Sequence, residues 1–137
     1  MLAATAQAAT PTFYASPVTG YAIHGYDPVA HFKRGEPVEG NPQYRVEHGG
    51  VTWLFASPAS RDTFLADPAR YTPQYGGYCA YAVSRGSIAQ TDPLAWTITD
   101  GKLYFNFDLR IRRLWASEMQ ANIERADRNW PGLRAGN

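Results

Sequence analysis

The chain of 137 residues has the length of one domain, and with 45% apolar and 18% charged residues it can bury a core. Thirteen basic and twelve acidic residues leave a formal net charge of +1, which excludes a polycation-type binder of nucleic acid or anionic lipid. No apolar run reaches the roughly 18 residues of a membrane-spanning helix, so no membrane span is expected.

Residues 1–16 lack periodicity and are expected to precede the domain. Ala6-Gln7-Ala8 has the A-x-A form of an export cleavage site, although no charged region and no full-length apolar core stand before it. The segment is therefore interpreted as the remnant of a signal peptide, which predicts a periplasmic or secreted protein. The alternative is a flexible terminus with no targeting role.

The first half of the domain is expected to begin with a strand over residues 21–26, where aromatic and small residues alternate. Asp27 followed by Pro28 predicts a capped short helix, and the Gly and Pro content of residues 33–42 predicts a loop.

A hairpin follows over residues 44–56, with Gly49-Gly50 at its turn. Ser57-Pro58 predicts the start of a second capped helix that ends at Asp67-Pro68. Phe64 and Leu65 on this helix are expected to face the hairpin.

The second half begins with a turn-rich segment, residues 72–86, built around Gly76-Gly77. Strands over 96–99 and 102–107 are expected to form another hairpin, with Asp100-Gly101 at its turn.

Asp108 is expected to cap a last helix that runs to about Asp127 and is closed by Trp130-Pro131. Its apolar stripe consists of Ile111, Trp115, Met119, Ile123 and Ala126. The sequence thus predicts one α+β domain of hairpins and short helices with a long C-terminal amphipathic helix, over residues 17–131, followed by a tail at 132–137.

Cys79 is the one cysteine, which rules out an intramolecular disulfide, a CxxC redox pair and a cysteine-rich zinc ribbon. In an oxidising compartment, an unpaired thiol points to a metal site, a reactive site or an intermolecular bond. Gly76-Gly77 is expected to let backbone N–H groups approach the sulfur. The alternative is a buried cysteine packed among Tyr75, Tyr78 and Tyr81, and a ring-lined pocket for a small ligand at these tyrosines is a further alternative.

A metal at Cys79 needs further ligands, for which His24 and His31 are the candidates. Cysteine with two histidines matches the trigonal donor set of copper sites, so a copper ion is the expected cofactor. His48, beside a Gly-Gly turn, is expected to be solvated, and Met119 is expected to pack in the core instead of acting as an axial ligand. Asp27 is assigned to helix capping instead of base catalysis.

Four stretches resemble the YHS domain family, over about residues 20–131: GYDPVAHF, TWLFASPASRDTFLADPARYTPQYGGYCAYAVS, DPLAWTITDGKLYFNFD and ADRNWP. More narrowly, they resemble its stand-alone exported members, the YHS domain-containing (seleno)proteins. The resemblance implies heavy-metal binding, because YHS domains occur fused to copper-transporting ATPases and other metal-handling proteins. It also implies chalcogen chemistry at Cys79, because some stand-alone relatives carry selenocysteine there. The chain departs from the metal-handling modules in having no second thiolate.

Three functions are consistent with these observations. The first is an exported copper-binding protein that uses Cys79 with His24 or His31 and works with a metal-handling partner. The second is a thiol redox protein, a Cys79-dependent oxidoreductase that needs an external thiol. The third is a non-catalytic module that binds a small ligand or a protein. No hydrolase elbow, phosphate loop or dinucleotide fingerprint is present, and the oligomeric state is not encoded in any recognisable motif.

Overall fold

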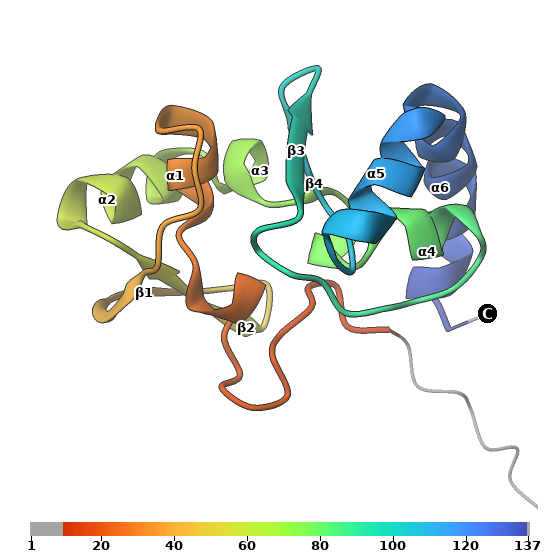
Figure 1. Ribbon diagram of the computed structural model, residues 1–137. Coiled ribbons are helices and arrows are strands. Elements are labelled where there is room, and N and C mark those ends of the chain that lie inside the picture. The colour runs from red at the N-terminus through yellow and green to blue at the C-terminus, as the bar shows by residue number, and fades with distance from the viewer. Residues whose placement is uncertain (1–9, 137) are drawn as a thin grey trace, which may run out of the picture.

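The computed structural model describes residues 10–136, and it confirms the expected α+β fold. Figure 1 shows two groups of helices with the β3–β4 hairpin between them. In chain order the elements are the 3₁₀ turn η1 (Ile23–Gly25), α1 (Pro28–Lys33), β1 (Asn41–His48), β2 (Val51–Phe55), α2 (Pro58–Ala66), α3 (Pro68–Tyr71), the 3₁₀ turn η2 (Gln74–Gly77), α4 (Ala80–Ser84), β3 (Trp96–Thr99), β4 (Lys102–Phe105), α5 (Leu109–Ser117) and α6 (Met119–Arg134).

The expected strand over residues 21–26 is wrong, because the chain turns through η1. Ile23 and His24 both adopt left-handed backbone angles, with φ of 53° and 51°. Each such non-glycine residue costs about 1–2 kcal/mol. In place of a strand, this stretch makes isolated β-bridges, Ala15–Ala22 and Tyr21–Thr52 among them. This strained turn positions Asp27 at the start of α1.

Asp27 caps α1 as expected and also ties this helix to α2. Its buried carboxylate accepts hydrogen bonds from the N–H groups of Val29 and Ala30, at 2.9 and 3.3 Å. The other oxygen accepts from the N–H of Ala56 at 3.0 Å and from the hydroxyl of Ser60 at 2.6 Å. A carboxylate with four donors is well compensated for its burial.

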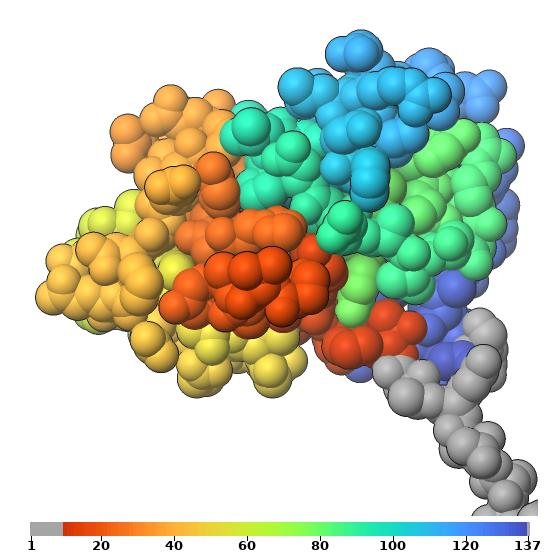
Figure 2. Space-filling model, turned by 60° about the horizontal axis from the view of Figure 1, so that its bottom comes forward, coloured from red at the N-terminus to blue at the C-terminus, as the bar shows by residue number. Residues whose placement is uncertain are grey.

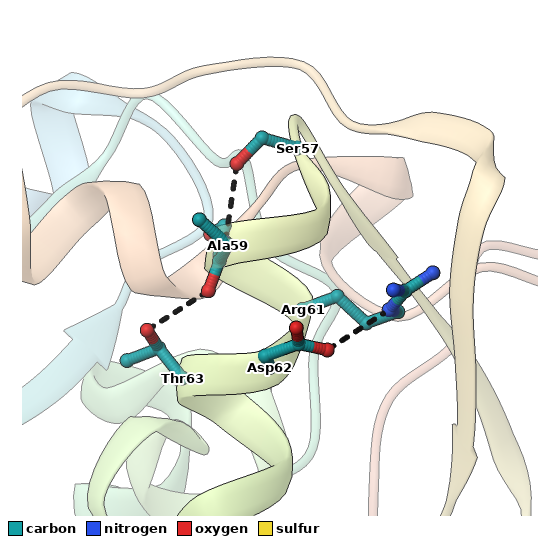
Figure 3. A network of polar contacts seen from close by, with 6 residues as sticks. Ser57, Ala59, Arg61, Asp62 and Thr63 are labelled. Atoms are coloured by element: carbon teal, nitrogen blue, oxygen red, sulfur yellow. Dashed lines mark hydrogen bonds and ion pairs between the residues drawn. The ribbon is translucent and has the colours of Figure 1, made fainter.

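Helix α2 has the predicted start. Figure 3 shows Ser57 at its N-terminus, where the Ser57 hydroxyl accepts from the N–H of Ser60 at 3.1 Å. The Thr63 hydroxyl donates to the Ala59 carbonyl one turn back, at 2.9 Å. Phe64 is buried against the first hairpin as expected, but Leu65 is 53% exposed, because consecutive helical residues point about 100° apart.

Both antiparallel hairpins have their predicted turns, at Gly49-Gly50 and at Asp100-Gly101. The first begins earlier than expected, at Asn41, and its register shifts between Asn41 and Arg45. The second ends at Phe105, two residues early. The turn-rich segment contains a short helix that was not expected, α4, which begins directly after Cys79.

The last helix is two helices, α5 and α6, separated at Glu118, whose φ and ψ of −136° and 51° are not helical. Asp108 caps α5 as expected, accepting from the N–H of Ile111 at 2.8 Å. At the break, the Trp115 carbonyl accepts from the Glu118 N–H at 3.3 Å and from the side-chain amide of Asn122 at 2.9 Å. Helix α6 does not end at Trp130-Pro131 but continues to Arg134.

Strand β4 separates two hydrophobic cores, because successive side chains of a strand point to opposite faces. Leu103 and Phe105 pack into the core formed with the first hairpin, α1 and α2. Tyr104 points into the second core, formed with α4, α5 and α6, where Trp115 is fully buried. Cys79 forms a parallel bridge with Phe105 and therefore lies at the boundary between the two cores.

Residues 10–16, expected to precede the domain, pack against it. The hydroxyl of Thr10 donates to the Leu133 carbonyl at 2.8 Å, and the N–H of Tyr14 donates to the Gly76 carbonyl at 2.8 Å. The export motif at residues 6–8 lies outside the described residues. No helix within residues 10–136 has both the length and the apolar composition that crossing a bilayer requires.

Candidate functional site at Cys79

Cys79 is held between η2 and α4 and is 2% exposed. Its backbone N–H donates to the Ala89 carbonyl at 3.0 Å, and its carbonyl accepts from Val83 in the first turn of α4. Three consecutive left-handed residues, Tyr75 to Gly77, lead the chain to this position. The thiol is thus fixed by backbone pairing on both sides.

Polar groups face the sulfur, although it is buried. The Asn106 side-chain oxygen lies 3.5 Å from Sγ and accepts the thiol hydrogen. Burial raises the pKa of the Cys79 thiol, and the backbone N–H groups of Ala82, Phe107 and Tyr81 oppose this rise by stabilising the thiolate. These N–H groups belong to α4 and to Phe107, which follows β4, and not to the segment at Gly76-Gly77 that was expected to bring them close to the sulfur.

Asn106, which the sequence analysis did not single out, contacts the sulfur of Cys79. It is completely buried, and its Oδ1 accepts from the Tyr81 N–H at 3.0 Å as well as from the thiol. Its Nδ2 has no hydrogen-bond partner among the described residues. An unpaired buried donor costs about 1–3 kcal/mol. The signal for it was present: one amide interrupts the aromatic run Tyr104, Phe105, Phe107.

A pocket of about 330 Å³ lies beside Asn106. It is lined by His24, Gln90, Thr91, Asp92, Pro93 and Phe107. Phe107 follows Asn106 in the chain, and the N–H of Asp92 donates to the Asn106 carbonyl at 3.1 Å, so the pocket walls are bonded directly to the residue that contacts the sulfur. In Figure 2 the red-orange part of the chain, which carries His24, meets green-teal atoms from the middle of the chain on the face shown.

His24 is presented to this pocket by the left-handed turn η1. Its Nε2 lies 2.9 Å from the Thr91 carbonyl and 3.4 Å from the Tyr14 hydroxyl. Because a carbonyl can only accept, Nε2 of the neutral ring carries the hydrogen, and Nδ1 keeps a lone pair. His24 can therefore act as a base or a ligand through Nδ1.

His31 occupies a different environment, inside the first core. Both ring nitrogens contact backbone carbonyls: Nδ1 lies 3.3 Å from that of Asp27, and Nε2 lies 3.2 Å from that of Pro93. The ring also packs edge-on against Trp96 and Phe105. Burial lowers the pKa of His31, although the two carbonyls and the nearby Asp27 charge act in the opposite direction.

Within residues 10–136 no group of three or more His, Cys, Asp or Glu side chains is arranged to hold a metal ion. The structure therefore does not bring Cys79, His24 and His31 into one such cluster. His48, expected to be solvated, is half-buried, with its ring edge-on against Phe64 at 5.6 Å. Met119 packs against the second core, as expected.

The three tyrosines near Cys79 have separate roles. Tyr75 donates to Asp127 at 2.8 Å, and burial together with this contact raises its pKa. The hydroxyl of Tyr78 donates to the Pro11 carbonyl at 3.0 Å and fastens the N-terminal segment. Tyr81 is half-buried, with the Arg85 guanidinium 4.9 Å from its ring centre. The pocket beside Asn106 is lined by none of them; Tyr75 lines another, of about 390 Å³, near the end of α6.

Comparisons of the chain with protein-family models, with curated proteins and with solved structures gave no match. The resemblance to YHS domains therefore stays a prediction.

Proposed function

We propose that this protein is a thiol redox protein in which Cys79 is reversibly oxidised by hydroperoxides. The observation that carries the proposal is the polar surrounding of a buried sulfur: Oδ1 of Asn106 accepts the thiol hydrogen at 3.5 Å, and backbone N–H groups of α4 and Phe107 stabilise the thiolate. A cysteine that only fills space is normally surrounded by apolar atoms. Hydrogen-bond donors at a sulfur instead favour forms that carry negative charge or an added oxygen.

The proposed oxidation is a two-electron step. The Cys79 thiolate attacks one oxygen of the hydroperoxide, an S–O bond forms, and the O–O bond breaks. The leaving hydroxide or alkoxide takes up a proton, so the peroxide is reduced to water or an alcohol while Cys79 becomes a sulfenic acid. The pocket lined by Phe107 and His24 has room for a small hydroperoxide, although Cys79 itself does not line it.

The return step needs a thiol from another molecule, because the chain contains one cysteine. That thiol attacks the sulfenic sulfur, water leaves, and a mixed disulfide forms. A second external thiol then releases the Cys79 thiol and carries away the disulfide. Because Cys79 is 2% exposed, the partner is a small thiol.

The raised pKa of the Cys79 thiol determines how fast this residue is expected to react with peroxide. A small thiolate fraction at neutral pH makes Cys79 a slow reactant whose rate increases with pH up to that pKa. This behaviour suits a protein that records the presence of peroxide more than one that removes it in bulk.

Mass spectrometry after a brief exposure to hydrogen peroxide, with a cyclic diketone present to trap sulfenic acid, tests the proposal. We expect one adduct on Cys79 of the native protein and no adduct in Cys79→Ser. A native thiol that gives no adduct, while Cys79→Ala loses only stability, would instead identify a binding module with a packed cysteine.

A copper-binding function is the second candidate, favoured by the lone pair that His24 Nδ1 keeps while Nε2 bonds to the Thr91 carbonyl. Its test is a Cu(I) titration of the reduced protein beside Cys79→Ser and His24→Gln. One tight equivalent that is lost in both variants would favour copper binding. Binding that survives Cys79→Ser would eliminate it.

A further inference from the structure

The buried amide of Asn106 carries an unused donor, Nδ2, and its oxygen contacts the sulfur of Cys79. Its Oδ1 accepts from the Tyr81 N–H at 3.0 Å, and a backbone N–H can only donate, so the amide cannot be turned over without losing that bond. Sγ of Cys79 lies 3.5 Å from the same oxygen. Nδ2 belongs to the same rigid planar group and has no partner among the described residues, although Asn106 is fully buried.

Other donors surround the sulfur from different elements. The Ala82 N–H comes from the first turn of α4, and the Phe107 N–H comes from the residue after Asn106. A thiol, which has one hydrogen and a weakly accepting sulfur, makes poor use of several donors. An oxygen attached to that sulfur would be a much stronger acceptor.

We propose that the Asn106 side-chain amide binds the oxygen that Cys79 acquires on oxidation, so that this site holds a cysteine sulfenic acid. The inference rests on the proposed redox function and specifies how the oxidised state is retained. Nδ2–H donates to the new S–O oxygen, while Oδ1 keeps its bond to Tyr81. No covalent bond changes in this step. The oxidant remains a hydroperoxide and the reductant an external thiol.

The consequence is a longer lifetime for the oxidised state. A sulfenic acid held by the amide is less free to reorient toward a second peroxide or an incoming thiol. Release then requires the loss of the Nδ2 hydrogen bond. A purely structural Asn106 would instead affect the stability of the fold and leave this lifetime unchanged.

The chain offers a matched control. Asn122 is also a buried asparagine, but its Nδ2 already donates to the Trp115 carbonyl at 2.9 Å. Asn106→Asp keeps the size and the acceptor for Tyr81 and replaces the free donor by an oxygen. Asn122→Asp makes the same chemical change in the second core. Asn106→Ala removes the amide altogether.

The experiment measures the lifetime of sulfenic acid on Cys79 by removing peroxide, adding a fixed concentration of a small thiol, and trapping the sulfenic acid that remains with a cyclic diketone after increasing delays. We expect a lifetime about tenfold shorter in Asn106→Asp and Asn106→Ala, the effect of losing one good hydrogen bond, and no change in Asn122→Asp. A lifetime within twofold of wild type in both Asn106 variants would overturn this inference while leaving the redox function intact. Wild-type protein that forms no sulfenic acid would overturn both.

A second measurement uses the unaltered protein and therefore does not depend on whether the variants fold. The side-chain amide protons of Asn106 and Asn122 are followed by nitrogen-15 NMR before and after one equivalent of peroxide. A downfield shift of one Asn106 proton, with Asn122 unmoved, is the expected result. An Asn106 amide unchanged in oxidised protein would contradict the proposal.

Discussion

Removal of the Asp27 carboxylate is predicted to destabilise the protein more than the loss of an ordinary helix cap. In Asp27→Ala the cap of α1 disappears, which alone costs about 1 kcal/mol. The Ala56 N–H and the Ser60 hydroxyl lose their charged acceptor as well, and bonds to charged groups contribute about 1.5–3 kcal/mol each. The free energy of unfolding should therefore fall by about 4 kcal/mol, a large share of the 5–15 kcal/mol typical of a domain.

Urea unfolding followed by tryptophan fluorescence measures this loss. Ser60→Ala removes one of the four donors and should lower the free energy of unfolding by about 1.5 kcal/mol. Asp27→Asn should fall between the two variants, because its amide keeps one oxygen for the cap but turns an NH₂ group toward one of the other donors. A loss below 1 kcal/mol in Asp27→Ala would refute the view that this carboxylate joins α1 to α2.

Three further predictions concern His31, Gly76 and Cys79. Because burial lowers the pKa of His31, the unfolded chain binds the proton more readily than the folded protein does. The free energy of unfolding should therefore decline as pH falls below about 6.5, by at most about 1.4 kcal/mol per pH unit for this one group. Urea unfolding between pH 5 and 8 should show a shallower decline in His31→Phe than in wild type, and equal slopes would exclude His31 as the cause. Gly76→Ala would place a Cβ 1.8 Å from the Thr12 carbonyl oxygen, at a residue whose φ is +63°. We therefore expect the free energy of unfolding to fall by about 3 kcal/mol or more, within the range of severe substitutions. A thermal unfolding midpoint within 2 °C of wild type would show that the structure relaxes freely around the added Cβ. Because the pKa of the Cys79 thiol is raised, hydrogen peroxide should oxidise native Cys79 faster as pH rises from 7 to 9. A bulky aromatic disulfide should react with this thiol only after unfolding, because Cys79 is 2% exposed. Rapid labelling of the native protein by the bulky reagent would contradict the buried position.

The elements that sequence predicted well are those with local chemical signals. Asp27-Pro28, Ser57-Pro58 and Asp108 each combine a capping side chain with a helix start, and all three caps form. Gly49-Gly50 and Asp100-Gly101 supply the left-handed residues that tight hairpins require, and both turns form where expected.

The features that sequence could not give depend on tertiary contacts. Nothing local indicates that Ile23, His24 and Tyr75 adopt left-handed angles, because non-glycine residues do so only when the surrounding structure compels them. The break at Glu118 is similarly non-local, since it is supported by a bond from Asn122 back to Trp115.

The candidate site was predicted in part. Sequence singled out Cys79, but not Asn106, which reaches the sulfur only because Cys79 pairs with the neighbouring residue, Phe105. His24 and His31 were grouped by residue type alone. The fold separates them, because one ring lines a surface pocket and the other is enclosed between two carbonyls.

The most direct test of the proposed function compares the oxidation of Cys79 in native and urea-unfolded protein. Reduced protein is treated with one equivalent of hydrogen peroxide, its intact mass is recorded, and a thiol is then added. We predict that native protein gains one oxygen at Cys79 and returns to its original mass with thiol. Oxidation of Cys79 only after unfolding would show that this cysteine is a packed structural residue and would contradict the account.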